Sequence, residues 1–163
     1  MDESEVKPIE RVIQVWEKVI DVQMHFNDLC LRLRSIAVST LGVLLAASAI
    51  AYKYAGVIEV CNYKVMTATF FIGISIFVWL AFFLMDRYWY HELLKGAMHH
   101  AKKIEATWES DIPEISLVKS VRQQSHSSLK MDAGKKLNIF YLGILVVQLI
   151  VLYFLVSNSI KIS

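Results

Sequence analysis

Apolar residues gather in three long runs, and every charged residue lies outside them. Residues 35–52, 65–85 and 137–160 contain no Asp, Glu, Lys or Arg over 18, 21 and 24 positions. A helix in a soluble core carries charge on one face every turn or two, whereas about 20 apolar residues cross a bilayer. The pattern therefore predicts three transmembrane helices.

Two stretches outside these runs are amphipathic. The first has a seam at alternating spacings of four and three residues: Val12, Trp16, Val19, Gln23, Phe26, Cys30 and Leu33. The second has a similar apolar stripe: Leu94, Ala97, Met98, Ala101, Ile104 and Trp108. A short loop joins the first two spans, so we expect their extensions to pack as an antiparallel hairpin. Packing of the seam around an oligomer axis, and an in-plane membrane helix, are the alternatives.

The expected fold is an all-α integral membrane protein with three transmembrane helices and a cytosolic helical hairpin that extends the first two spans. Its parts are a cytosolic amphipathic helix over 1–34, a transmembrane hairpin over 35–85 (spans 35–55 and 65–85), a cytosolic helical region and loop over 86–136, and a third transmembrane helix over 137–160. Within the loop region we expect a short helix over 114–124 and irregular segments at 125–128 and 132–134.

Composition and charge sharpen this picture. Hydrophobic residues make up 56% of the chain and charged residues 20%, and because the charges are segregated from the apolar runs, this composition excludes a soluble globular protein. The net charge of +2 is too small to indicate a nucleic-acid partner. Fourteen Lys and Arg residues precede the first run or lie between the second and third, and three lie elsewhere. The positive-inside rule then predicts a cytoplasmic amino terminus and an external carboxyl terminus. Cys30 and Cys61 fall on opposite sides, so they cannot pair within one chain.

Two helix faces within the runs stand out. The first span carries small residues on one face: Ser35, Ser39, Gly42, Ala46 and Ala49. Small residues let helices approach closely in lipid, so this face packs either against the second span or against another subunit. The third span carries polar residues on one face: Asn138, Tyr141 and Gln148. An amide in hydrocarbon needs a polar neighbour, which favours an interhelical hydrogen bond over a pore lining.

Motifs of catalysis and cofactor binding are missing from the sequence. His91-Glu92 opens a zinc-protease pattern that fails at its last position, Lys95. No glycine-rich phosphate loop and no nucleophile elbow occur. Charge-free spans argue against a proton-coupled transporter and a carboxylate-ring filter. We therefore expect no enzyme activity, no cofactor and no metal.

A basic cluster lies between the second and third runs. Its members, a candidate site for an anion, a signalling nucleotide or a partner, are Lys102, Lys103, Lys119, Arg122, His126 and Lys130. These bases either set topology and meet anionic lipid head groups, or bind a phosphate-bearing nucleotide or an acidic cytosolic protein.

The layout resembles a known group of proteins. An amphipathic helix opening with Val15-Trp16-Glu17-Lys18 leads into closely spaced spans, and Arg87-Tyr88-Trp89-Tyr90-His91 runs into a long cytosolic helix. This arrangement is similar to the small multi-span membrane effectors of bacterial antiphage defence, such as SLATT-type effectors and the transmembrane effectors of retrons and cyclic-oligonucleotide systems. The third span departs from the usual two-span SLATT pattern.

The resemblance implies a homo-oligomer in the bacterial inner membrane that permeabilises or depolarises this membrane when a signal or partner activates it. Two other functions fit the same layout. One is a non-enzymatic anchor or adaptor subunit that recruits a cytosolic protein. The other is a small channel or transporter subunit.

Overall fold

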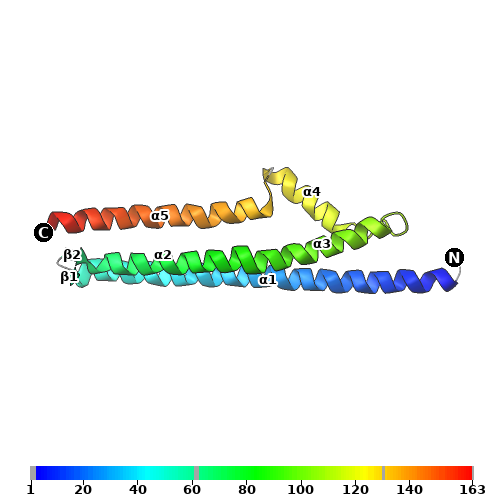
Figure 1. Ribbon diagram of the computed structural model, residues 1–163, viewed down its shortest axis with the longest axis horizontal. Helices are drawn as coiled ribbons and strands as arrows, with labels where there is room; N and C mark the ends of the chain where they lie inside the picture. Colours follow the sequence, from blue (N-terminus) through cyan, green and yellow to red (C-terminus); the bar gives the residue numbers. More distant parts are fainter. Residues whose placement is uncertain (1–2, 61–62, 130, 163) are drawn as a thin grey trace. The chain divides into compact units, whose positions relative to one another are not determined.

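The computed structural model describes residues 3–60, 63–129 and 131–162, and it is all-α, with 87% of the chain helical (Figure 1). In chain order the elements are α1 (Glu3–Tyr54), β1 (Val57–Val60), β2 (Tyr63–Met66), α2 (Thr67–Met85), a π-helix (Asp86–Tyr90), α3 (His91–Trp108), α4 (Leu117–Leu129) and α5 (Ala133–Ile162). The predicted helical fold class is confirmed.

Three helical stretches are long and apolar enough to cross a membrane, namely Pro8–Tyr54, Thr67–Trp108 and Ala133–Asn158. Only 11% to 22% of the most apolar window in each stretch is buried within the protein. The remaining apolar surface needs a non-aqueous cover, since exposed apolar area of this extent is rare on soluble monomers. Length, composition and exposure are thus those expected of a multi-pass membrane protein.

The chain divides into two compact units. The charged unit contains Met1–Leu31 and Arg87–Lys136, and the apolar unit contains Arg32–Asp86 and Leu137–Ser163. Two stretches of helix, α1 and the continuous α2–π–α3 segment, contribute to both units.

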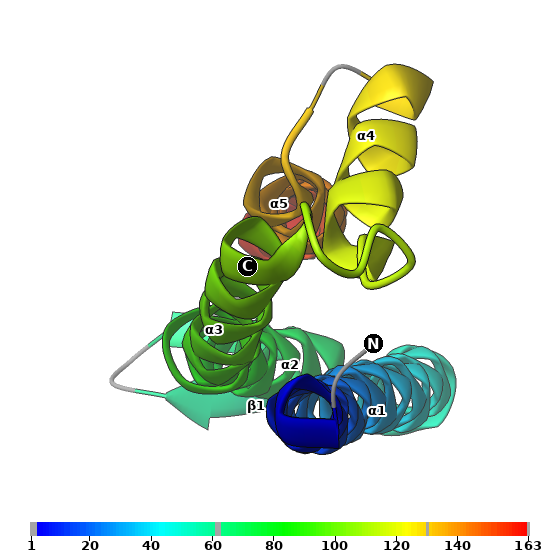
Figure 2. The same cartoon turned by 90° about the vertical axis from the view of Figure 1, so that its right-hand side faces the viewer.

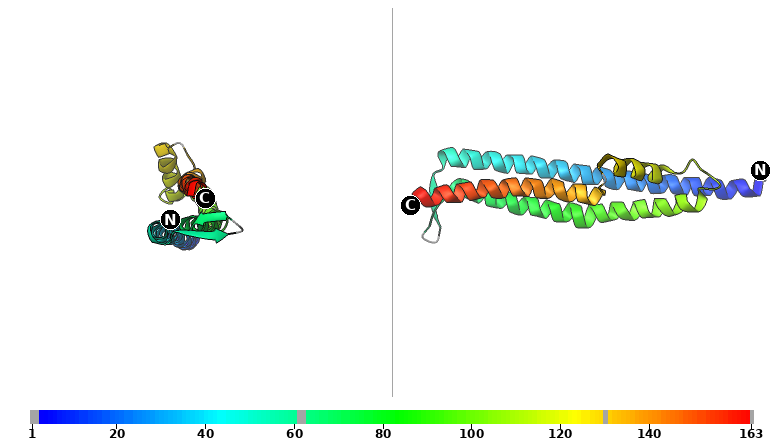
Figure 3. Two further views of the ribbon diagram at one scale, coloured as in Figure 1. Left: turned by 90° about the vertical axis from the view of Figure 1, so that its left-hand side faces the viewer. Right: turned by 90° about the horizontal axis from the view of Figure 1, so that it is seen from above.

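In the apolar unit, α2 runs antiparallel to both α1 and α5. Ser48 of α1 donates to the carbonyl of Ala68 near the start of α2, while partners near the end of α2 come from early in α5. Figure 3 shows these three helices side by side, with the two strands at one end. The buried cluster of this unit consists of Ala37, Trp79, Leu137 and Tyr141.

The connection between α1 and α2 is a β-hairpin rather than a plain loop. Its strands pair antiparallel, with Val57 opposite Met66. Gly56 adopts a φ of 63° and lets the chain leave α1, a conformation that costs other residues more. The second span was expected to begin at residue 65, but residues 65–66 belong to β2 and the helix starts at Thr67. Pairing with β-branched Val57 and Ile58 explains the difference.

In the charged unit, the predicted apolar faces are the less exposed ones. Every described seam and stripe position is buried or half-buried, and Ala101 is fully buried. Trp16 of α1 donates from Nε1 to Glu105 Oε1 of α3 at 3.3 Å, so the two helices pack on each other. Figure 2 shows the turn that links α3 to α4.

Three loop boundaries differ from expectation. The short helix spans Leu117–Leu129 instead of 114–124, so residues 125–128 are helical, because no Gly or Pro interrupts them. Ala133 and Gly134 also belong to a helix, α5, rather than to a loop. The amides of Lys135 and Lys136 donate to the carbonyl of Asp132, and the helix begins four residues earlier than the expected residue 137.

Candidate functional site

The candidate site is a buried ionic cluster in the apolar unit, which we call the junction cluster and define as Arg34, Asp86 and Tyr141. Arg34 donates from Nε to Asp86 Oδ2 at 2.6 Å and from Nη2 to Oδ1 at 3.1 Å. The Tyr141 hydroxyl donates to Asp86 Oδ2 at 3.1 Å. One carboxylate therefore joins α1, the π-helix and α5.

Burial makes this cluster energetically important. The Asp86 side chain is 0% exposed, whereas the Arg34 side chain is 30% exposed. A two-point Arg–carboxylate contact fixes both position and orientation. Removing one member of a buried pair leaves the other charge uncompensated and typically costs about 3–5 kcal/mol. The cluster can hold the three helix segments in one arrangement and release them when it opens.

The cluster lies at a change in helix geometry. Asp86 is the first residue of the π-helix Asp86–Tyr90, between α2 and α3. A π-helical turn inserts extra chain into an α-helix and is frequent at functional sites.

Sequence reasoning missed the Arg34–Asp86 pair. Arg34 immediately precedes the first charge-free run and Asp86 immediately follows the second, so the two charges lie at the edges of the predicted spans. In an antiparallel hairpin these two ends meet, so opposite charges at the outer edges of paired runs are the signal that could have found the pair.

Aromatic contacts hold Tyr141 in place. Trp79 of α2 donates from Nε1 to the carbonyl of Tyr141 at 3.0 Å, and the two rings lie 4.9 Å apart. The ring of Phe83 lies 5.3 Å from that of Tyr141. The hydroxyl is thus aimed at Asp86 by packing against α2.

The other polar residues of the third span have different surroundings. Gln148, 2% exposed, donates from Nε2 to Ser75 Oγ at 3.0 Å, and Ser75 donates in turn to the carbonyl of Ile72 at 2.8 Å. This is an interhelical hydrogen bond of the kind the sequence favoured. Within the described part of the chain, Gln148 Oε1 and Asn138 Oδ1 are buried and accept no hydrogen bond. Tyr141 and Gln148 therefore both form hydrogen bonds with α2.

The small-residue face of α1 does not pack against α2. All five of its residues are exposed: Ser35, Ser39, Gly42, Ala46 and Ala49. The helix instead buries Ala37, Ser48 and Ala51. The small face is therefore not packed within the chain. Packing against another subunit is the other alternative that the sequence left open.

The basic cluster is only partly assembled. Lys102 and Lys119 line a cavity of about 340 Å³ between α3 and α4, together with Glu105 and Glu109. Lys119 forms an ion pair with Glu109. Lys103 is exposed and is not among the lining residues. Lys130, and the side chains of Arg122 and His126, lie outside what the structure describes.

Glu105 is the organising residue of the charged unit, and the sequence did not single it out. Its side chain is 5% exposed and accepts from Trp16, from the amide of Val118 at 2.9 Å and from the amide of Lys119 at 3.2 Å. It therefore caps α4 and ties α1, α3 and α4 together. Its carboxylate occupies the position where an anion would meet the start of α4, which disfavours a simple anion site there.

Glu92 forms ion pairs on the surface of α3. Glu92 accepts from Lys95 and from Arg87, each at 2.9 Å, and these hydrogen bonds, that of Lys95 first, lower the pKa of the Glu92 carboxyl below its usual value of 4.5. Among the residues that the structure describes, no group of three or more His, Cys, Asp or Glu side chains could hold a metal ion. Cys30 is buried, and Cys61 lies outside the described residues.

Comparison of the chain with protein-family models, with curated proteins and with solved structures finds no match.

Proposed function

We propose that the protein is a non-enzymatic membrane effector of bacterial antiphage defence, which oligomerises and depolarises the inner membrane when a signal or partner activates it. The observation that carries the proposal is the junction cluster. It lies where two continuous helical stretches change from charged sequence to apolar sequence.

The cluster supplies the two states that an effector needs. With Arg34, Asp86 and Tyr141 joined, α1, α2 and α5 are held in the resting arrangement. A ligand or partner bound to the charged unit opens the cluster if it binds the opened form more tightly. Helix continuity through α1 and through the π-helix provides the mechanical path to the spans.

Oligomerisation is supported by the exposed small-residue face of α1. Three helices are too few to enclose a water-filled path, so permeability requires several copies. A face with Gly42 and Ala46 at its centre, with nothing within 4 Å of a Cβ built at Gly42, lets a helix of another copy approach closely. In the proposed topology the amino terminus and the charged unit are cytoplasmic and the carboxyl terminus is external.

The proposal is tested by expressing the protein with its genomic neighbours in bacteria and following a potential-sensitive dye during phage infection. The effector function predicts loss of membrane potential before cell lysis. Cells that stay polarised while the protein co-purifies with a stable cytosolic partner would favour the adaptor function instead.

A further inference from the structure

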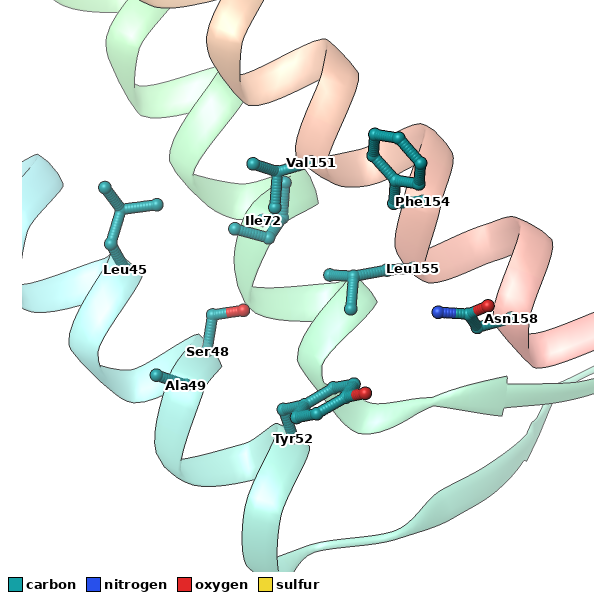
Figure 4. Close-up of a pocket in the computed structure, with 9 residues that line it drawn as sticks. All are labelled: Leu45, Ser48, Ala49, Tyr52, Ile72, Val151, Phe154, Leu155 and Asn158. Atoms are coloured by element: carbon teal, nitrogen blue, oxygen red, sulfur yellow. The ribbon is translucent and has the colours of Figure 1, made fainter.

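The apolar unit contains a groove between α1, α2 and α5, near the end that carries the β-hairpin (Figure 4). Its volume is about 440 Å³. The walls are apolar over most of their length and include Leu45, Ile72, Val151 and Leu155. Junction-cluster residues do not line it, so it is a separate feature of the unit.

Polar atoms occur at one end of the groove. Tyr52 of α1 and Asn158 of α5 lie toward the end of their helices, and Figure 4 shows their polar atoms beside the space between α1 and α5. Neither side chain forms a hydrogen bond with another residue that the structure describes. Ser48, the other hydroxyl of the groove, already donates to the carbonyl of Ala68 at 3.1 Å. Both side chains are exposed at one end of the apolar groove, Tyr52 at 54%, so their donors are accessible to a ligand there.

Helix lengths place these donors at the edge of a bilayer. Tyr52 follows Arg34 by 18 residues, about 27 Å of helix, and Asn158 follows Asn138 by 20 residues, about 30 Å. Both lengths are close to the hydrocarbon thickness of about 30 Å. From Tyr52 the groove reaches down to Leu45, about 10 Å into the hydrocarbon.

We propose that this groove binds a membrane phospholipid, with one acyl chain along its apolar walls and an ester group at its polar end. The Tyr52 hydroxyl and the Asn158 amide donate hydrogen bonds, and the ester carbonyl of a lipid accepts them at this depth. The inference rests on the membrane insertion in the proposed function, but not on defence or depolarisation.

The polar end of the groove favours a lipid over a helix of a second copy. A membrane-spanning helix pairs its backbone carbonyls internally, so an apolar helix has no acceptor to offer the Tyr52 hydroxyl and the Asn158 amide. The exposed small face of α1 offers such a copy a flatter surface, although Ala49 belongs to both features.

The test uses the full-length protein, purified in mild detergent, incubated with vesicles of phosphatidylethanolamine and phosphatidylglycerol and weighed by native mass spectrometry. We expect the protein to retain a phospholipid and Ala49→Leu, which fills the groove, to lose it. The matched control is Ala81→Leu, an equal change at an exposed alanine of α2 outside both the groove and the small face of α1. Tyr52→Phe removes one hydroxyl, and we expect it to weaken retention without altering helix content.

Four outcomes decide between the alternatives. Loss of lipid in Ala49→Leu but not in Ala81→Leu supports the site. Equal retention or equal loss in the two variants overturns it, and so does the absence of retained lipid in the unaltered protein. Release of the protein from membranes by alkaline carbonate refutes the membrane insertion itself, separately from the lipid site.

Discussion

Removing Arg34 should destabilise the protein more than removing Asp86, because the two charges are buried to different extents. In Arg34→Met, the Asp86 carboxylate stays 0% exposed and keeps the Tyr141 hydroxyl as its one partner among the side chains that the structure describes. Breaking a buried pair in this way costs about 3–5 kcal/mol. In Asp86→Leu, the Arg34 side chain is already 30% exposed and can turn toward water or head groups. We expect a smaller cost there, about 1–3 kcal/mol.

The double variant Arg34→Met/Asp86→Leu separates the ion pair from simple packing. Replacing both members of a buried pair with apolar residues of similar volume is often neutral or stabilising. The Tyr141 hydroxyl then loses its acceptor, at about 1 kcal/mol. The double variant should therefore be more stable than Arg34→Met alone.

The assay is unfolding of the purified protein in detergent, followed by circular dichroism, with Arg32→Met as the matched control because Arg32 is exposed on the same helix. Two results would refute the reasoning. One is a cost for Arg34→Met no larger than that for Arg32→Met. The other is a double variant as unstable as the sum of the two single variants.

Three further predictions concern other polar contacts. Gln148→Leu should change the free energy of unfolding by less than about 1 kcal/mol, because it removes a hydrogen bond and also a buried unpaired oxygen. Gln148→Ala should cost about 2–4 kcal/mol, because it leaves a cavity. Glu105→Gln should lower the free energy of unfolding by about 1–3 kcal/mol, with a lower melting temperature and altered tryptophan fluorescence. Glu109→Gln, which removes a surface ion pair, should lower it by less than about 1 kcal/mol. Because the pKa of Glu92 is lowered in the folded state, its stabilising effect is present above pH 4.5 and is lost as the pH falls through the folded-state pKa. The melting temperatures of the unaltered protein and of Glu92→Gln should therefore become equal in acid. A constant difference between them down to the lowest pH would contradict this.

The spans and the amphipathic faces could be predicted because they depend on local periodicity. The seam from Val12 to Leu33 lies on the less exposed side of α1, and three apolar helical stretches occur where the charge-free runs are. These features follow from which residues can face water and which cannot, and each is written in a continuous stretch of sequence.

The junction cluster and the Glu105 contacts could not be predicted in the same way. Asp86 and Arg34 are 52 positions apart, and Glu105 meets Trp16 across 89 positions. Such pairs depend on the register between helices, that is, on how far one helix is shifted along the other. The β-hairpin at 57–66 and the π-helix set this shift, and hydrophobic periodicity does not encode it. The small face of α1 shows the same limit, since its spacing identified a packing surface but not its partner.

The central claim is that the junction cluster holds the spans in a resting state, and membrane potential in living cells tests it most directly. Cells expressing Arg34→Met should lose the signal of a potential-sensitive dye without any trigger, while cells expressing the unaltered protein or the matched control Arg32→Met stay polarised. Membrane-inserted, folded Arg34→Met that leaves cells fully polarised would contradict the claim, as would equal depolarisation by Arg34→Met and Arg32→Met.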